Sequence, residues 1–179
     1  MNLLWDLYWP VLTVAIVLGV NAGAIAFRKR GSSQFKKINW PLRRKLVLAG
    51  GIALVFAFGA IWHGTIGKGE RFVAETERFS RRVLVDFEMA PVTAVVERNP
   101  IKRQLILSGP ADDFQRSELV RILNDVPGVS GVRWTNQQPG FALPLLLEVE
   151  LAALLSFGAG LVLAYLLELR RRSNAQWRW

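Results

Sequence analysis

The sequence contains no cysteine and only one histidine. Without cysteine the chain can form no disulfide framework, thiolate nucleophile or cysteine metal cluster. The single histidine, His63, excludes a catalytic triad that uses histidine and any site with several histidine ligands within one chain. No phosphate-binding glycine loop, serine nucleophile motif or dinucleotide fingerprint occurs either. We therefore expect no catalytic and no metal-ligating residues, and a protein that is not an enzyme.

Hydrophobic residues make up 51% of the 179 residues, which is more than an ordinary soluble domain of this size carries. A helix that crosses a hydrocarbon core of roughly 30 Å needs about 20 apolar residues. Three runs meet this requirement, at residues 7–27, 46–66 and 145–167. Aromatic rings with a polar edge lie near the predicted ends, as at membrane interfaces: Tyr8, Trp9, Trp40, Trp62 and Tyr165. The sequence predicts a helical membrane protein with three transmembrane helices.

The net charge of +9 is unevenly distributed. Eight of the 23 basic residues lie between Arg28 and Lys45, where no acidic residue occurs, and four more lie between Arg170 and Arg178. The other 11 share residues 68–133 with ten acidic residues, so no basic surface for nucleic acid is expected. Because Lys and Arg in short loops stay in the cytoplasm, we expect the N-terminus and residues 67–142 outside and the C-terminus inside.

The basic loop between the first two spans is also a candidate site for anionic lipid headgroups, because each base near a membrane surface contributes about 1 kcal/mol. Docking on an acidic partner is the alternative. The predicted headgroup residues are Arg28, Lys29, Arg30, Lys36, Lys37, Arg43, Arg44 and Lys45.

Small residues recur at helical spacing in all three spans, and small side chains let helices approach closely where lipid provides no hydrophobic drive for association. The predicted helix-packing residues are Gly19 and Gly23 in the first span, Ala53 and Ala57 (with Ala49) in the second, and Ser156, Gly160 and Ala164 in the third. They indicate either that the three helices pack on one another or that one stripe docks a foreign subunit. We also expect Asn21 to form an interhelical hydrogen bond.

Between the second and third spans the pattern changes to that of a small α+β module. Apolar positions at helical spacing from Gly69 to Met89 predict an amphipathic helix that continues from the second span and buries Phe72, Thr76, Phe79, Val83 and Phe87. Two β-prone runs then meet at Asn99-Pro100, and Asp112 can cap a second helix that Pro127-Gly128 ends. The run "VSGVRWT" predicts a third strand. The expected order is helix, strand, strand, helix, strand, with two helices on one face of a sheet.

The run from Leu105 to Trp134, "LILSGPADDFQRSELVRILNDVPGVSGVRW", resembles the C-terminal half of a BON domain. It has an apolar strand that ends in Gly109, a helix with a polar start, and a closing "VPGVSGV" in which Gly128 follows the helix. The preceding helix and hairpin stand in the order of that family's first half, so the similarity covers about residues 69–136 and none of the spans. The resemblance implies a non-catalytic periplasmic domain of the bacterial envelope that contacts phospholipid or other proteins.

Three polar residues lie within or beside the apolar runs, and each has a structural and a functional interpretation. His63 follows Gly59 by one turn, a spacing that would leave room for a bacteriochlorophyll or haem, although the ring could equally reach interfacial water. Glu148 and Glu150 open the third span two residues apart, so on a helix they face nearly opposite directions and cannot share a proton. We expect them to lie at the interface, one of them paired with Arg71 or another base of the module.

These patterns predict six segments: a transmembrane helix at 1–27, a cytoplasmic loop at 28–45, a helix at 46–66, the periplasmic BON-like module at 67–142, a helix at 143–169 and a cytoplasmic tail at 170–179. We expect a scaffold protein of the bacterial inner membrane without a cofactor, whose partners are membrane lipids and other membrane-protein subunits. The alternative is an accessory subunit of a respiratory or photosynthetic complex, with bacteriochlorophyll or haem near His63.

Overall fold

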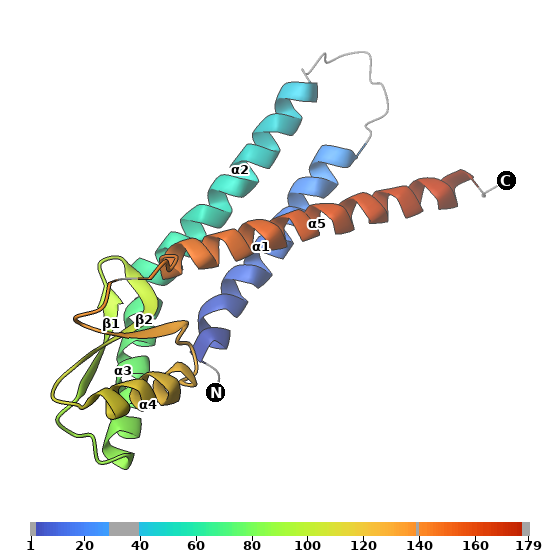
Figure 1. Cartoon of the computed structure of the whole chain (residues 1–179). Helices are drawn as coiled ribbons and strands as arrows, with labels where there is room; N and C mark the ends of the chain where they lie inside the picture. The colour runs from blue at the N-terminus through green and yellow to red at the C-terminus, as the bar shows by residue number, and fades with distance from the viewer. Residues whose placement is uncertain (1–2, 29–39, 139, 177–179) are drawn as a thin grey trace. The chain divides into compact units, whose positions relative to one another are not determined.

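The structure is a computed structural model that describes residues 3–28, 40–138 and 140–176. Among these residues three helices are long and apolar enough to cross a membrane: Leu4–Phe27, Pro41–Thr65 and Leu145–Asn174. They correspond to α1 (Leu3–Phe27), to α2 (Trp40–Ala60) with the π-helical turn η1 (Ile61–Thr65), and to α5 (Leu145–Gln176) (Figure 1). The three predicted membrane helices are therefore present.

Two helix ends lie further out than the sequence predicted. Helix α2 begins at Trp40 rather than at residue 46, and α5 continues through the arginine run to Gln176. Lys and Arg are good helix formers whose long side chains can reach water from a helix, so a basic run need not end one. Arg172 also donates to the Phe27 carbonyl at the end of α1 over 2.9 Å, which satisfies a terminal acceptor.

The described chain divides into two compact units. The first, which we call the module, comprises 61–148 together with the residues before Trp9. The second, the membrane unit, comprises the remainder of α1, α2 and the rest of α5. The module therefore includes the start of α1 and the start of α5 as well as the segment between the spans.

The module contains α3 (Lys68–Asp86), β1 (Thr93–Arg98), β2 (Ile101–Ser108), α4 (Asp113–Asn124) and β3 (Gly131–Trp134), in the predicted order. The sheet order is β1-β2-β3, in which β1 and β2 pair antiparallel and β3 joins β2 in parallel. The parallel pairing requires a crossover connection, which α4 supplies.

The core lies on one face of this sheet. Leu105 and Leu107 of β2 are fully buried and are paired with Val96 and Trp134, which are also buried. Helix α3 contacts β1, and α4 contacts β3. Because successive strand residues point to opposite faces, the other face carries Val95, which is 46% exposed. The module is thus a two-layer sandwich of helices on a sheet.

Local sequence signals explain where the second module helix begins and ends. Asp112 accepts from the Gln115 amide at 2.7 Å while the Gln115 side chain accepts from the Asp112 amide at 3.0 Å, which forms a capping box. After the helix, Gly128 has a φ of 96°, a conformation that glycine adopts without strain. The turn at Asn99-Pro100 connects β1 and β2 as predicted.

The predicted buried face of α3 is partly wrong. Phe72 and Thr76 are buried as predicted, but Phe79 and Phe87 are 41% and 54% exposed. The other buried side chains of the helix are Val73, Ser80 and Leu84. Small side chains at 76 and 80 let the helix lie close to the sheet, which large rings would prevent. Helix α3 also does not continue α2, because the π-helical turn and Gly67, with a φ of 73°, separate them.

Candidate functional site

A polar cluster joins the sheet of the module to the first turns of two membrane helices, and we call it the Glu148 junction. Glu148 Oε2 accepts from Arg103 Nη1 at 3.1 Å and from the Tyr8 hydroxyl at 3.0 Å. Arg103 Nε also donates to the Gly128 carbonyl at 2.8 Å. The Arg103 and Glu148 side chains are 22% and 20% exposed, so their attraction is screened less than that of a surface pair. As expected, one of the two glutamates pairs with a base of the module, although the base is Arg103 and not Arg71.

A second contact ties the start of α1 to the turn after α2. Trp62 Nε1 donates to the Leu7 carbonyl at 3.1 Å, and the Lys68 ammonium lies 5.1 Å from the centre of the Trp62 ring. Together with the Glu148 junction, these bonds connect α1, η1 and α5 to the sandwich. These contacts lie within the module, because the module includes the first residues of α1 and of α5.

His63 lies in the π-helical turn, and its ring packs against Gly69 at the start of α3. Its Nε2 is buried and has no hydrogen-bond partner among the described residues. The space beside Gly59, which the alternative interpretation assigned to a flat cofactor ring, is filled by the Glu150 carboxylate. The geometric basis for a cofactor beside Gly59 is therefore absent, and a ligand role for His63 stays a prediction.

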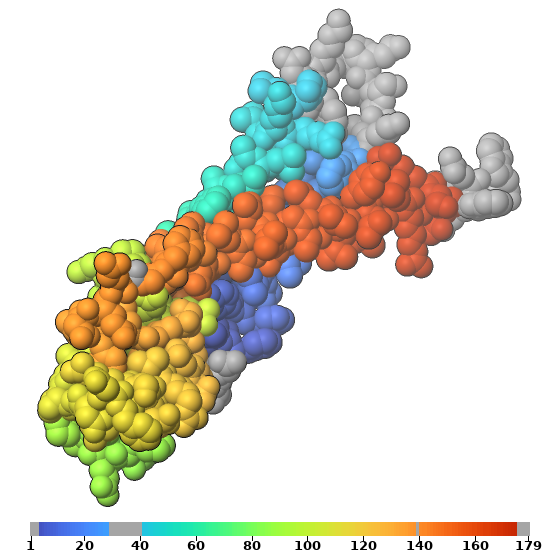
Figure 2. All heavy atoms as spheres, viewed as in Figure 1, coloured from blue at the N-terminus to red at the C-terminus, as the bar shows by residue number. Residues whose placement is uncertain are grey.

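A hollow of the module lies on α4 and the residues around β3. It has a volume of about 420 Å³, and we call it the Trp134 pocket. The Arg116 guanidinium lies 5.3 Å from the centre of the Trp134 ring, and the Trp134 Nε1 donates to the Arg116 carbonyl at 3.2 Å. Polar residues complete its lining: Asp113, Ser117, Asn136 and Gln137. Figure 2 shows the helix that carries Arg116, in yellow, on the outer surface of the module.

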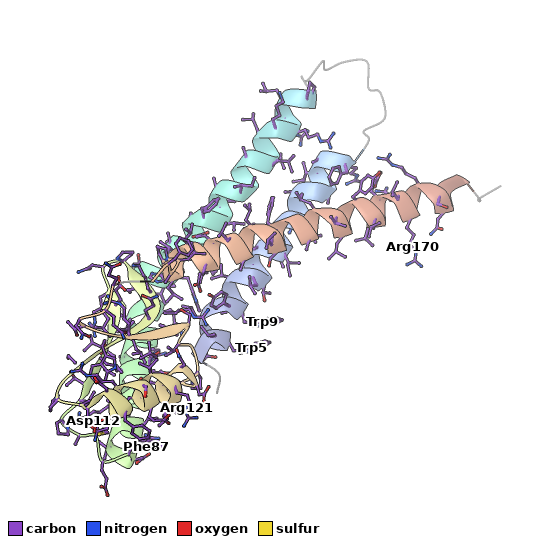
Figure 3. All side chains as sticks on the ribbon, viewed as in Figure 1. Trp5, Trp9, Phe87, Asp112, Arg121 and Arg170 are labelled. Atoms are coloured by element: carbon purple, nitrogen blue, oxygen red, sulfur yellow. The ribbon has the colours of Figure 1, made fainter. Side chains whose placement is uncertain are left out.

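Arg116 and Asp113 are the two charged residues that line the Trp134 pocket, and Arg116 is the basic one. In the described part of the chain it forms no ion pair, and its Nε is buried without a hydrogen-bond partner. Arg121 on the same helix differs, because it donates to Glu118 Oε2 at 2.6 Å and 3.0 Å. Figure 3 shows Asp112 and Arg121 near opposite ends of that helix. An arginine stacked on an indole with an unused donor can bind a carboxylate or a polar peptide group.

The predicted helix-packing residues divide into two groups. Gly19 meets the Phe157 carbonyl and the Gly160 Cα, and Gly23 meets Ala164, so the predicted small residues of α1 and α5 face each other. Ser156 is half-buried.

On α2 the predicted stripe is on the other side of the helix. Ala53 and Ala57 are exposed, while the buried positions are Gly51, Val55 and Gly59. Asn21 is also exposed and donates to the Val17 carbonyl of its own helix at 2.8 Å, so the predicted interhelical bond is not found. In a helix that is apolar on all sides, periodicity cannot show which face packs.

Half of the predicted headgroup residues are described. Arg28, Arg44 and Lys45 are exposed, Arg43 is half-buried, and the Arg44 guanidinium lies 5.2 Å from the centre of the Phe27 ring. The others, Lys29, Arg30, Lys36 and Lys37, lie outside the described residues. Figure 3 shows Arg170 on the last turns of α5, where the second basic cluster begins.

Sequence reasoning missed Arg103 and the Trp134 pocket. Arg103 forms its ion pair with a residue 45 positions later, and no local spacing signals such a partner. No protein-family model, curated protein or solved structure matches this chain. The resemblance to the BON family therefore rests on the sequence motifs alone.

Proposed function

We propose that this protein is a non-catalytic membrane scaffold that presents its α+β module on the outer side of the bacterial inner membrane to bind a partner. The observation that carries this proposal is the Trp134 pocket on the module, where the Arg116 guanidinium lies 5.3 Å from the centre of the Trp134 ring.

The Trp134 pocket favours a protein partner over a lipid headgroup. Gly128, just beyond the end of α4, lies against Leu4 at the start of α1. Arg116 and Ser117 lie in the first turns of α4, a helix of 12 residues and thus about 18 Å long. The pocket therefore opens near the end of α4 that is remote from α1. A partner segment that carries an acidic group would pair with Arg116. The alternative is that this BON-like module binds phospholipid headgroups.

The test is purification of the tagged full chain from its native membrane in a mild detergent, followed by mass spectrometry of the proteins that co-purify. We expect a stoichiometric partner with the wild type and its loss with Arg116→Gln. Arg121→Gln is the matched control, because it removes the same charge from the same helix outside the pocket. Equal retention of the partner by both variants would contradict a role for the pocket, and recovery of phospholipid alone would favour headgroup binding.

The orientation is tested separately with topology reporters. A reporter after Trp179 or near Gly31 should be active only in the cytoplasm, because all 12 clustered bases would then lie on that side. An external signal at either position would overturn the placement of the module.

A second candidate is an accessory subunit of a respiratory or photosynthetic complex. Two observations favour it: the exposed stripe of Ala53 and Ala57 on α2, and the His63 Nε2 without a partner among the described residues. Small residues on an unused helix face permit close packing against another membrane helix. Large co-purifying membrane subunits and a visible absorption band that His63→Ala removes would support this candidate, and a colourless preparation without them would exclude it.

A further inference from the structure

Glu150 is a buried carboxylate within a membrane helix, and it has no charged partner among the described residues of the membrane unit. It is 6% exposed, and its Oε2 has no hydrogen-bond partner among the described residues. The residue lies in the span Leu145–Asn174, five positions after its start, and therefore about 8 Å along the helix. An ionised carboxylate at such a site is strongly destabilised, and a neutral carboxylic acid is not.

The fold of α2 provides the space for this carboxyl group. A methyl group at residue 59 would overlap both the Oε1 and the carboxyl carbon of Glu150, so only glycine allows the present contact. Gly59 is itself buried, and the π-helical turn η1 begins two residues after it, at Ile61. Irregular turns of this kind are frequent at functional sites in helices.

No described charge of the membrane unit lies near enough to neutralise Glu150. On α2 the nearest basic residue is Lys45, 14 positions before Gly59 and thus roughly 21 Å away along the helix. On α5 the next ionisable acid or base is Glu168, roughly 27 Å along the helix, and it is paired with Arg172 at 3.0 Å. Two further ionisable groups lie near this site in sequence: Glu148, two residues before Glu150, and His63, four residues after Gly59.

Those two groups belong to the module. Glu148 is bound by Arg103 and Tyr8, and the His63 ring lies on Gly69. The part of α1 within the membrane unit, from Trp9 to Phe27, contains no acidic and no basic residue, and Arg28 follows its end. A proton is therefore the simplest counter-charge for Glu150.

We propose that Glu150 is a proton-binding site within the membrane, a carboxyl group that is protonated at neutral pH and sits in a notch made by Gly59. Such a group can take up a proton from a neighbouring subunit or from one side of the membrane and return it. This role lies beyond the scaffold function and does not depend on it.

A hydrophobic carbodiimide tests this site, because it reacts with protonated carboxyls in apolar surroundings. The acid transfers its proton to a carbodiimide nitrogen and the carboxylate oxygen adds to the central carbon, after which the acyl group shifts to nitrogen. The product is an N-acylurea that carries the whole reagent, so no atom leaves. Native membranes that contain the full chain are labelled at pH 7, and the modified residue is identified by mass spectrometry of the digested protein.

We expect strong labelling at Glu150 and little at Glu148, because the reagent reacts with neutral carboxylic acids in apolar surroundings, whereas the Glu148 carboxylate is ion-paired with Arg103. Glu148 is the matched control, because it lies two residues away and is paired with Arg103. Glu150→Gln should abolish the labelling, and a water-soluble carbodiimide should not reproduce it. Equal labelling of both glutamates would overturn the proposal.

Infrared spectroscopy provides a measurement that does not depend on access of the reagent. The difference between the wild type and Glu150→Gln at pH 7 should contain the carbonyl stretch of one protonated carboxylic acid. Loss of a carboxylate band in its place would show that Glu150 is ionised and would refute the assignment. The thermal unfolding of Glu150→Gln should stay close to that of the wild type, because glutamine has nearly the same shape and no charge.

Discussion

The close contact of α1 and α5 yields a quantitative prediction for Gly19 and Gly160. A Cβ on Gly19 would overlap the Phe157 carbonyl and lie 3.1 Å from the Gly160 Cα, and a Cβ on Gly160 would lie 2.9 Å from the Val20 amide nitrogen. Because these atoms belong to backbone, the helices must separate to admit a methyl group. Overpacking of this kind costs typically about 1–3 kcal/mol.

The helix propensity of alanine acts in the opposite direction. Alanine is favoured over glycine inside a helix by up to about 1 kcal/mol. We therefore expect Gly19→Ala and Gly160→Ala to destabilise the fold by a net of about 1–2 kcal/mol, which changes the folding equilibrium roughly 5- to 30-fold. The matched control is Gly158→Ala on the same helix, because nothing lies within 4 Å of a Cβ at that position. It should be neutral or slightly stabilising.

The assay is unfolding of the purified full chain in mixed micelles with rising sodium dodecyl sulfate, followed by circular dichroism and tryptophan fluorescence. The midpoint should fall for the two contact variants and stay or rise for the control. If all three variants shift the midpoint equally and in the same direction, the contact between α1 and α5 does not stabilise the protein and the reasoning fails.

Three further predictions concern the module. Glu148→Gln should lower the stability by about 1.5–3 kcal/mol, since a hydrogen bond from the charged Arg103 is lost, and thermal unfolding in detergent would measure this. Asp112→Ala should cost about 1 kcal/mol through loss of the helix cap, and a variant as stable as the wild type would contradict the capping box. Arg121 lowers the pKa of Glu118 through its hydrogen bond, so the pair should be present above the ordinary glutamate pKa and be lost as the pH falls through the lowered value. Arg121→Ala should raise that pKa in a carboxyl NMR titration without a measurable change in unfolding, since the pair is fully exposed.

The elements that sequence predicted well are those whose signals are local. The helix cap at Asp112, the turn at Asn99-Pro100 and the length of the apolar runs depend on neighbouring residues, and each is present in the structure. The buried faces were less predictable. Phe79 of α3 and Phe87 at its end remain exposed, because the small Thr76 and Ser80 fit against the sheet. Hydrophobicity alone does not reveal how close two elements lie.

The membrane helices show the same limit more strongly. All faces of α2 are apolar, so composition could not distinguish the exposed Ala53 and Ala57 from the buried Gly51 and Gly59. Lipid is as apolar as the helix interior, and the packing face is therefore chosen by shape. Gly59 was found by sequence as a glycine with open space beside it, but the group that fills the space is Glu150, 91 positions later.

For Glu148 and Glu150, the spacing along the helix predicted the directions of the two side chains but not their partners. Two residues on a helix differ in direction by about 200°, and this already indicated that the pair cannot share a proton. It did not indicate that one carboxylate would receive two donors, Arg103 and Tyr8, while the other would meet only a glycine notch. Charge compensation explains the difference between them, because an ionised group needs its donors and a neutral acid does not. The first glutamate therefore ties β2 to the first turns of α1 and α5 within the module, and the second is free to exchange a proton.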